Sequence, residues 1–399
     1  MKTQAVLQVE QRIAGSPIYR LLEPRPWLGF SLLPAPDPGD VFFDMEGDPL
    51  FDIGTGLEYL FGCWLPTPGT YRSYWGLDRA TEKAAFERFV DFIVERRFAY
   101  PGAHVYHYAD YEKSALRRLA QRHCTREDEV DDLLRGEVFV DLFAVVRQTM
   151  MISQESYSIK KLEPFYGFVR SGTVRAGDDS ILLFEEWRRA RDARCLEDIE
   201  RYNDDDCRST YRLREWLLEL REEAERRFGV AIALRPLKRP EEPCHPAFVQ
   251  GCKSCERRER DEREARQTSA TQTELLAGIV APADAAELAT MPDAPRARYL
   301  LGNLISYHRR EDKPLFWEFH DRCDNVDRLV EFDKNALGGL VWRANVAPFK
   351  AQPAHRNLSF TYRFPDQTYD LSRGRLFEPV SRQEAGELIA IDELSLIHI

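Results

Sequence analysis

The sequence of 399 residues lacks several features that would assign it to a class of protein at once. It has no apolar run close to the roughly 20 residues that span a bilayer, so we expect no membrane segment. It begins without the apolar core of a secretory signal, and its eight cysteines are scattered. Together these indicate a reduced, cytoplasmic protein. It contains no Gly-x-x-x-x-Gly-Lys-Ser/Thr loop, which argues against ATP hydrolysis of the P-loop kind by this polypeptide.

An excess of positive charge is missing as well. Lys and Arg number 56 against 67 Asp and Glu, which gives a formal net charge of -11. This balance argues against a surface that binds polyanions everywhere, although a local basic patch beside an acidic metal site can still take nucleic acid. What the chain does have is 43% hydrophobic residues, over a length that suggests two or three domains.

Shifts in composition divide the chain into four parts. A short amphipathic helix is expected near the N-terminus, followed by an extended linker in which prolines recur from Pro24 to Pro38, so that the folded part begins at Val41. Alternating strand and helix patterns then give way to a charged linker, a helical segment and a small β-rich domain. The predicted parts are 1–39, 40–228, 229–283 and 284–399.

The second part has the pattern of an α/β domain. Strands are predicted from Val41 onward and at 57–65, 70–75, 104–108 and 138–142. Helices are predicted at 80–97, 111–123 and 196–228, where apolar residues recur at helical spacing. This order predicts a mixed sheet flanked by helices.

The first predicted strand ends in carboxylates. Asp44 and Glu46 are two apart, so on a strand they project to the same side, and we expect Val41 and Phe43 to share that side. Two buried carboxylates side by side repel each other, and a divalent metal is the usual remedy. The alternative is that Glu-Gly-Asp-Pro is only a turn after a strand.

Two further acidic stretches follow. Asp110 and Glu112 begin a predicted helix directly after a strand, which is also ordinary chemistry for a first helical turn. Tyr202 and Asp206 are four apart and therefore share a helix face, near the apolar side of a long helix. The alternative is that residues 203–206 are a solvated acidic patch.

In this order, the stretches resemble the signature of the DEDD 3′–5′ exonucleases of the tyrosine subclass, which have an RNase H-like fold. They are closer still to the YprB-type RNase H-like domain of bacterial RecB-like nuclease–helicase fusion proteins. The residues that carry the resemblance are 43–49, Tyr106, His107, Tyr108, Tyr111, Glu112, 156–162, Tyr202, Asn203, Asp206 and Cys207. The resemblance covers about residues 40–222.

The resemblance implies a catalytic set of Asp44, Glu46, Glu112, Tyr202 and Asp206. The four carboxylates would bind two Mg²⁺ or Mn²⁺ ions, with Asp44 bridging both, and Tyr202 would hydrogen-bond the attacking water. Hard oxygen ligands favour these ions over zinc.

The second acid departs from the family pattern, which has Asp where this chain has Glu112. Asp110, two residues earlier, is the competing candidate. Asp141, at the end of a strand, either points into the site or caps the next helix. Lys160 and Lys161 are predicted to contact nucleic-acid phosphates, because they are basic and follow the acid motifs in sequence.

The resemblance also predicts a larger parent protein. The N-terminal helix looks like the end of a missing RecB-like domain, and residues 284–399 look like the beginning of a truncated helicase-associated region. The predicted function is a metal-dependent nuclease acting on DNA or RNA, the alternative a non-catalytic nucleic-acid-binding or scaffolding module. Cys244, Cys252 and Cys255 could also bind a metal, but they contain one Cys-x-x-Cys in linker-like surroundings.

Overall fold

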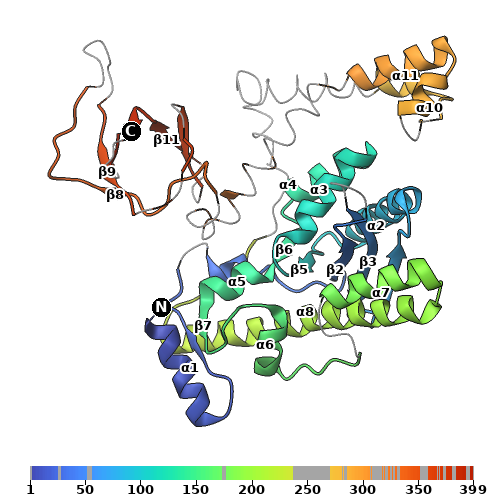
Figure 1. Cartoon of the computed structure of the whole chain (residues 1–399). Coiled ribbons are helices and arrows are strands. Elements are labelled where there is room, and N and C mark those ends of the chain that lie inside the picture. The colour runs from blue at the N-terminus through green and yellow to red at the C-terminus, as the bar shows by residue number, and fades with distance from the viewer. Residues whose placement is uncertain are drawn as a thin grey trace, which may run out of the picture. The chain divides into compact units, whose positions relative to one another are not determined.

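Figure 1 shows the structure of the chain, a computed structural model. It describes residues 2–25, 28–51, 56–172, 177–236, 270–280, 282, 285–305, 307, 317, 319, 322–323, 326, 329, 333–350, 358–365, 367, 369–371, 374–379, 383–391 and 396–398. The cysteines at 244, 252 and 255 lie outside these residues. The chain separates into two units, Met1–Glu242 and Pro243–Ile399, and each is described by itself.

A five-stranded mixed sheet forms the centre of the first unit. Its strands are β2 (Val41–Asp48), β3 (Leu57–Leu65), β4 (Thr70–Trp75), β5 (Val105–His107) and β6 (Phe139–Asp141). Their order is β4-β3-β2-β5-β6; β2 is antiparallel to β3 and parallel to β5. A tight connection joins β3 to β4, and a helix joins β4 to β5. Helices also join β5 to β6, as these parallel neighbours require. The mixed sheet with flanking helices confirms the predicted fold class.

Helices cover both faces of this sheet. On one face α2 (Arg79–Ala99), α3 (Tyr111–His123) and α4 (Glu127–Arg135) pack on the side chains of Val41, Phe43 and Met45. On the other face α5 (Leu142–Thr149), α6 (Ile159–Tyr166) and α8 (Ala193–Phe228) pack on Phe42, Tyr106 and Val140. In Figure 1, α7 (Gly177–Ala190) runs beside α8 in front of β2 and β3.

Along strand β2, odd- and even-numbered residues therefore point to opposite faces of the sheet. Phe42 belongs to the core under α8, while Val41 and Phe43 belong to the core under α2. The prediction that Val41 and Phe43 share the face of Asp44 and Glu46 is wrong, because a period of two places even-numbered residues together. It is Phe42 that shares the carboxylates' side.

The N-terminal segment is an integrated part of the first unit, since it pairs with a strand and contributes buried side chains. Helix α1 (Lys2–Ala14) leads to β1 (Tyr19–Leu21), which pairs antiparallel with β7 (Met150–Ile152). The predicted proline-rich linker contains a 3₁₀ helix, η1 (Gly29–Leu32), and both Phe30 and Leu33 are buried in the α8-side core. The linker prediction is wrong here because two apolar side chains between the prolines find a place in that core.

The second unit holds short elements. Helices α10 (Ala285–Thr290) and α11 (Asp293–Ile305) precede two small sheets. One has the order β12-β13-β9-β8 and the other pairs β10 with β11. Their strands are β8 (Val341–Trp342), β9 (Thr361–Arg363), β10 (Arg375–Glu378), β11 (Gln383–Glu387), β12 (Ala390–Ile391) and β13 (Leu396–His398). Among the described helices of the whole chain, none combines the length and apolar character needed to span a membrane.

Candidate metal centre

Three carboxylates from two distant parts of the sequence converge on the α8 side of the sheet. Asp44 and Glu46 come from β2 and Asp206 comes from α8; one oxygen of each lies within 4.8 Å of the others. Glu46 and Asp206 are buried, with 6% and 8% of their surfaces exposed, and Asp44 is partly exposed. The predicted pairing of the strand and helix motifs in space is therefore present.

A close approach of α8 to the sheet makes this convergence possible. Asn203, fully buried, donates its amide to Asp44 Oδ2 at 2.8 Å, and the same nitrogen lies 3.5 Å from Glu46 Oε1. Its amide oxygen accepts from the Tyr71 hydroxyl. A Cβ at Gly62, the β3 residue opposite Asp44, would lie only 1.6 Å from that amide oxygen, so only glycine fits there.

The hydrogen-bond donors that reach Asp44 and Glu46 are neutral. Besides Asn203, the Ser180 hydroxyl of α7 donates to Glu46 Oε2 at 2.7 Å. Burial, followed by the charges of Asp206, Glu46 and Glu112, raises the pKa of Asp44 well above its usual range. Burial and the charge of Asp206 raise the pKa of Glu46 to about 8. The charges of Arg170 and Lys160 lower these two pKa values in turn, but they do not outweigh burial and carboxylate repulsion, so neither carboxyl is fully compensated at neutral pH.

Tyr202 lies one helical turn before Asp206 and beside the same cluster. Burial, then the negative charges of Asp206, Glu46 and Asp44, raise the pKa of its hydroxyl, so the phenol stays protonated and able to donate. Lys160 Nζ lies 2.7 Å from this hydroxyl and 4.7 Å from the centre of the ring. The predicted lysine is thus in the site, in contact with the predicted tyrosine.

This donor set suits a hard divalent cation. Three oxygen ligands that repel one another, in a partly open site without thiolates or imidazoles among them, match the preference of Mg²⁺ and Mn²⁺. An ion bound there would supply the charge that the protein leaves missing around Asp44 and Glu46.

A comparison with protein families agrees with this geometry. Residues 41–218 match the family model described as the RNase H superfamily. This segment is an RNase H-like domain. It covers the five-stranded sheet and most of α8, and so includes Asp44, Glu46 and Asp206. Neither the curated proteins nor the solved structures gave a match.

Glu112 lies near this centre of the RNase H-like domain without joining it. It is 3% exposed at the start of α3, and its Oε2 lies 3.4 Å from Nδ1 of His107. It lies outside the group of three carboxylates, yet its charge contributes to the raised pKa of Asp44. Burial raises the pKa of Glu112 itself, against the hydrogen bond and charge of His107.

The two competing acids have local partners. Asp110 accepts a hydrogen bond from Ser114 Oγ at 2.9 Å. Asp141 caps α5, because its Oδ1 accepts from the backbone N–H groups of Phe143 and Ala109, each at 2.8 Å. The charge of Glu112 is among the main causes of the raised pKa of Asp44.

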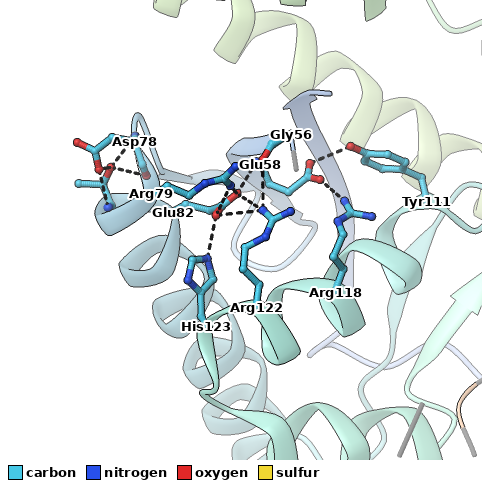
Figure 2. A network of polar contacts seen from close by, with 10 residues as sticks. Gly56, Glu58, Asp78, Arg79, Glu82, Tyr111, Arg118, Arg122 and His123 are labelled. Carbon is cyan, nitrogen blue, oxygen red and sulfur yellow. Dashed lines mark hydrogen bonds and ion pairs between the residues drawn. The ribbon is translucent and has the colours of Figure 1, made fainter. Parts of the chain in front are cut away.

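A polar network ties the beginning of α3 to the sheet (Figure 2). Glu58 of β3 accepts from the Tyr111 hydroxyl at 2.8 Å and from the Arg118 guanidinium. A Cβ at Gly47 would lie 2.2 Å from Glu58 Oε2, so the strand that carries Glu46 passes directly beside this carboxylate. Since Tyr111 precedes Glu112, the contact to Glu58 helps to fix where Glu112 points.

A cleft of about 710 Å³ opens onto the metal-ligand candidates. Asp44, Tyr202 and Asp206 line it together with basic and aromatic side chains that include Arg147, Lys160, Tyr108 and Tyr157. Arg147 lies over the Tyr157 ring at 5.2 Å. Lys161 does not line the cleft; its ammonium pairs with exposed Glu155 at 2.5 Å.

The sequence analysis gave several residues of the centre no role. Asn203 carries part of the resemblance, but its helical position next to Tyr202 on the buried face could also have identified its place beside the carboxylates. Ser180 and Arg170 had no such signal, because α7 and the loop before it were not predicted. Their proximity to the carboxylates is a product of the three-dimensional fold alone.

Proposed function

We propose that the RNase H-like domain is a metal-dependent nuclease that hydrolyses phosphodiester bonds of DNA or RNA, as a 3′–5′ exonuclease using two Mg²⁺ or Mn²⁺ ions. The observation that carries this proposal is the convergence of Asp44, Glu46 and Asp206, with raised pKa values at Asp44 and Glu46, in a cleft lined by basic and aromatic side chains. The match of the same segment to the RNase H superfamily model supports it.

The residues divide the work as follows. Asp44 would hold both ions, while Glu46 and Asp206 would complete the coordination of one. The ions would stabilise the attacking and leaving oxygens of an in-line displacement. Tyr202, protonated because of its acidic surroundings, would donate to the attacking water and hold its lone pair toward the phosphorus. Glu112 would reach the second ion through a water, which suits its place outside the group of three.

Substrate contacts would come from the cleft. Lys160 and Arg147 offer positive charge to backbone phosphates, and Tyr108 and Tyr157 offer faces on which bases can stack. Lys161, paired with Glu155 at the surface, would contact the strand farther from the reacting phosphate. We also propose that the domain works within a larger cytoplasmic nuclease–helicase protein, with residues 284–399 as its helicase-associated part.

One observation favours a second candidate. Glu112, in place of the Asp of the family pattern, pairs with His107 and stays outside the group of three carboxylates. A non-catalytic module that binds or scaffolds nucleic acid would tolerate such a change in the second motif.

The test is degradation of end-labelled single-stranded DNA and RNA in Mn²⁺, Mg²⁺ or EDTA, by the wild type and by Asp44→Ala. The proposal expects metal-dependent shortening from the 3′ end by the wild type, and a loss of at least about a thousand-fold in the variant. Folded wild-type protein that binds but does not cleave, with binding unchanged in Asp44→Ala, would support the scaffold instead.

A further inference from the structure

One oxygen of the Asp206 carboxylate, Oδ1, is held by an arginine. Arg170 Nη2 lies 2.6 Å from Asp206 Oδ1 and 2.6 Å from Glu163 Oε1, and its Nε lies 3.2 Å from Glu163 Oε2. The ion pairs are shielded, with only 13% of the Arg170 side chain exposed and 10–11% of the two carboxylates. One guanidinium thus joins a carboxylate of α6 to a candidate metal ligand of α8.

The loop that carries Arg170 is itself fixed to α8. Asp205 accepts from the backbone N–H groups of Ser171 and Gly172, at 2.8 and 3.0 Å, and from the Ser171 hydroxyl at 3.0 Å. Adjacent aspartates of α8 therefore have different partners: Asp205 holds the loop, and Asp206 receives the arginine that the loop presents. The interpretation of residues 203–206 as a solvated patch is wrong for both.

Glu163 is fixed as well. It is 8% exposed, and its Oε1 accepts from the Ser209 hydroxyl at 3.0 Å; Ser209 in turn lies 2.8 Å from the Tyr166 hydroxyl. The guanidinium therefore contacts a carboxylate whose own orientation is fixed by Ser209. The arrangement Glu163–Arg170–Asp206 has few ways to rearrange.

We propose that Arg170 is a positioning residue that orients the Asp206 carboxylate toward Asp44 and Glu46 and thereby sets the affinity of the centre for a divalent ion. This rests on the proposed function, in which Asp206 is a metal ligand. Partners that hydrogen-bond a metal ligand from behind typically contribute 10–100-fold to metal affinity, because they fix the ligand before the ion arrives.

An opposing effect has to be weighed. A guanidinium beside a metal site repels a dication, so its removal would on that ground tighten binding. Glu163 cancels most of this repulsion, since it makes two hydrogen bonds to the same guanidinium. Orientation then outweighs repulsion, and losing Arg170 weakens metal binding.

The test is calorimetric titration of the whole chain with Mn²⁺, in the absence of nucleic acid. Arg170→Gln is expected to bind Mn²⁺ about 10–100-fold more weakly than the wild type. Glu163→Gln removes one of the two carboxylates that compensate the guanidinium charge and is expected to weaken binding as well. Arg170→Lys keeps the charge but cannot bridge both carboxylates, and should fall between Arg170→Gln and the wild type.

Arg208→Gln is the matched control. Arg208 pairs with Asp204 on the same helix at 2.7 Å, but 42% of its side chain is exposed and the pair is outside the group of three carboxylates. This variant should bind Mn²⁺ like the wild type. Melting curves in EDTA show which variants are folded; should Arg170→Gln be unfolded, Arg170→Lys and Glu163→Gln decide.

The outcomes are distinct. Unchanged or tighter Mn²⁺ binding by folded Arg170 variants overturns the positioning role, while leaving the metal centre intact. An equal loss in Arg208→Gln also overturns it, because the effect would then be general to charges on α8. A wild type that binds no Mn²⁺ contradicts the proposed function itself.

Discussion

Two groups of buried acids lie in the RNase H-like domain, and their surroundings differ. Glu82 of α2 is fully buried, yet it accepts from Arg79, Arg122 and His123, at 3.0, 3.2 and 2.8 Å, as Figure 2 shows. It also accepts a hydrogen bond from the backbone N–H of Glu58, at 2.7 Å. Asp44 and Glu46 are met instead by neutral donors and by other carboxylates.

The pKa shifts follow this difference. Burial opposes ionisation of Glu82, but the hydrogen bonds of His123, Glu58 and Arg79 and the charge of Arg122 outweigh it and lower its pKa. At Asp44 and Glu46 burial is joined by carboxylate repulsion and the pKa rises. A buried acid surrounded by cations stabilises the fold, whereas a group of buried acids whose repulsion outweighs the nearby cations is suited to bind a metal ion.

The largest effect is expected from breaking the compensated group. Glu82→Gln should lower the free energy of unfolding by about 3 kcal/mol, because it leaves the guanidinium charges of Arg79 and Arg122, and the imidazole of His123, without their carboxylate. Urea denaturation measures this. The folded fraction should bind Mn²⁺ as tightly as the wild type; a loss of Mn²⁺ binding without a loss of stability would reverse the comparison.

Removing one acid from the group of Asp44, Glu46 and Asp206 should raise the free energy of unfolding instead of lowering it. Because folding raises the pKa of Glu46 from 4.5 to about 8, the folded state binds the extra proton, and stability is lost as pH rises from about 4.5 to about 8. Glu46→Gln removes this loss. In EDTA the variant should be close to the wild type in stability near pH 5 and exceed it by at least about 2 kcal/mol near pH 8.

Denaturation curves of both proteins at several pH values check this. A difference that does not change between pH 5 and pH 8 would mean that burial and the charge of Asp206 do not raise the pKa of Glu46 in the folded state. Glu82, with a lowered pKa, should stabilise the fold above its ordinary pKa of 4.5 and lose that contribution as pH falls below it.

Glu58 is intermediate in its surroundings, since it is buried and has one cationic partner. Its substitution should have the smallest effect on stability. Burial raises its pKa, although Arg118 and Tyr111 act against this. Its partner Arg118 is 44% exposed, so the ion pair is screened by water. Glu58→Gln keeps an acceptor for the Tyr111 hydroxyl and should cost about 0.5–1 kcal/mol in thermal denaturation. A cost as large as that of Glu82→Gln would place Glu58 with the compensated acids.

Local patterns were enough to predict much of the sheet and its helices. The predicted bounds are observed for the strands at 57–65 and 70–75 and for the helix at 111–123. A hairpin connection and the spacing of apolar residues on a helix depend only on residues close in sequence. The same holds for Asp44 and Glu46 on one face of β2 and for Tyr202 and Asp206 one turn apart on α8.

What could not be predicted depends on contacts between distant segments. Phe30 and Leu33 look like parts of a linker until a core across the sheet buries them. The bond from Ser180 to Glu46 spans 134 residues, and the bond from Arg170 to Asp206 depends on a loop that Asp205 holds. No periodicity in the sequence encodes such partners, since each is defined by the packing of separate elements.

The central claim is that the uncompensated acids form a metal centre, and the thermal stabilisation of the protein by Mn²⁺ tests it most directly. With Mn²⁺ at about a hundred times its dissociation constant, the melting temperature of the wild type should rise by roughly 5 °C or more. Glu82→Gln should melt lower but rise equally, and Asp44→Asn should not respond. A wild type that does not respond, or an Asp44→Asn variant that rises as far as the wild type, would contradict the account.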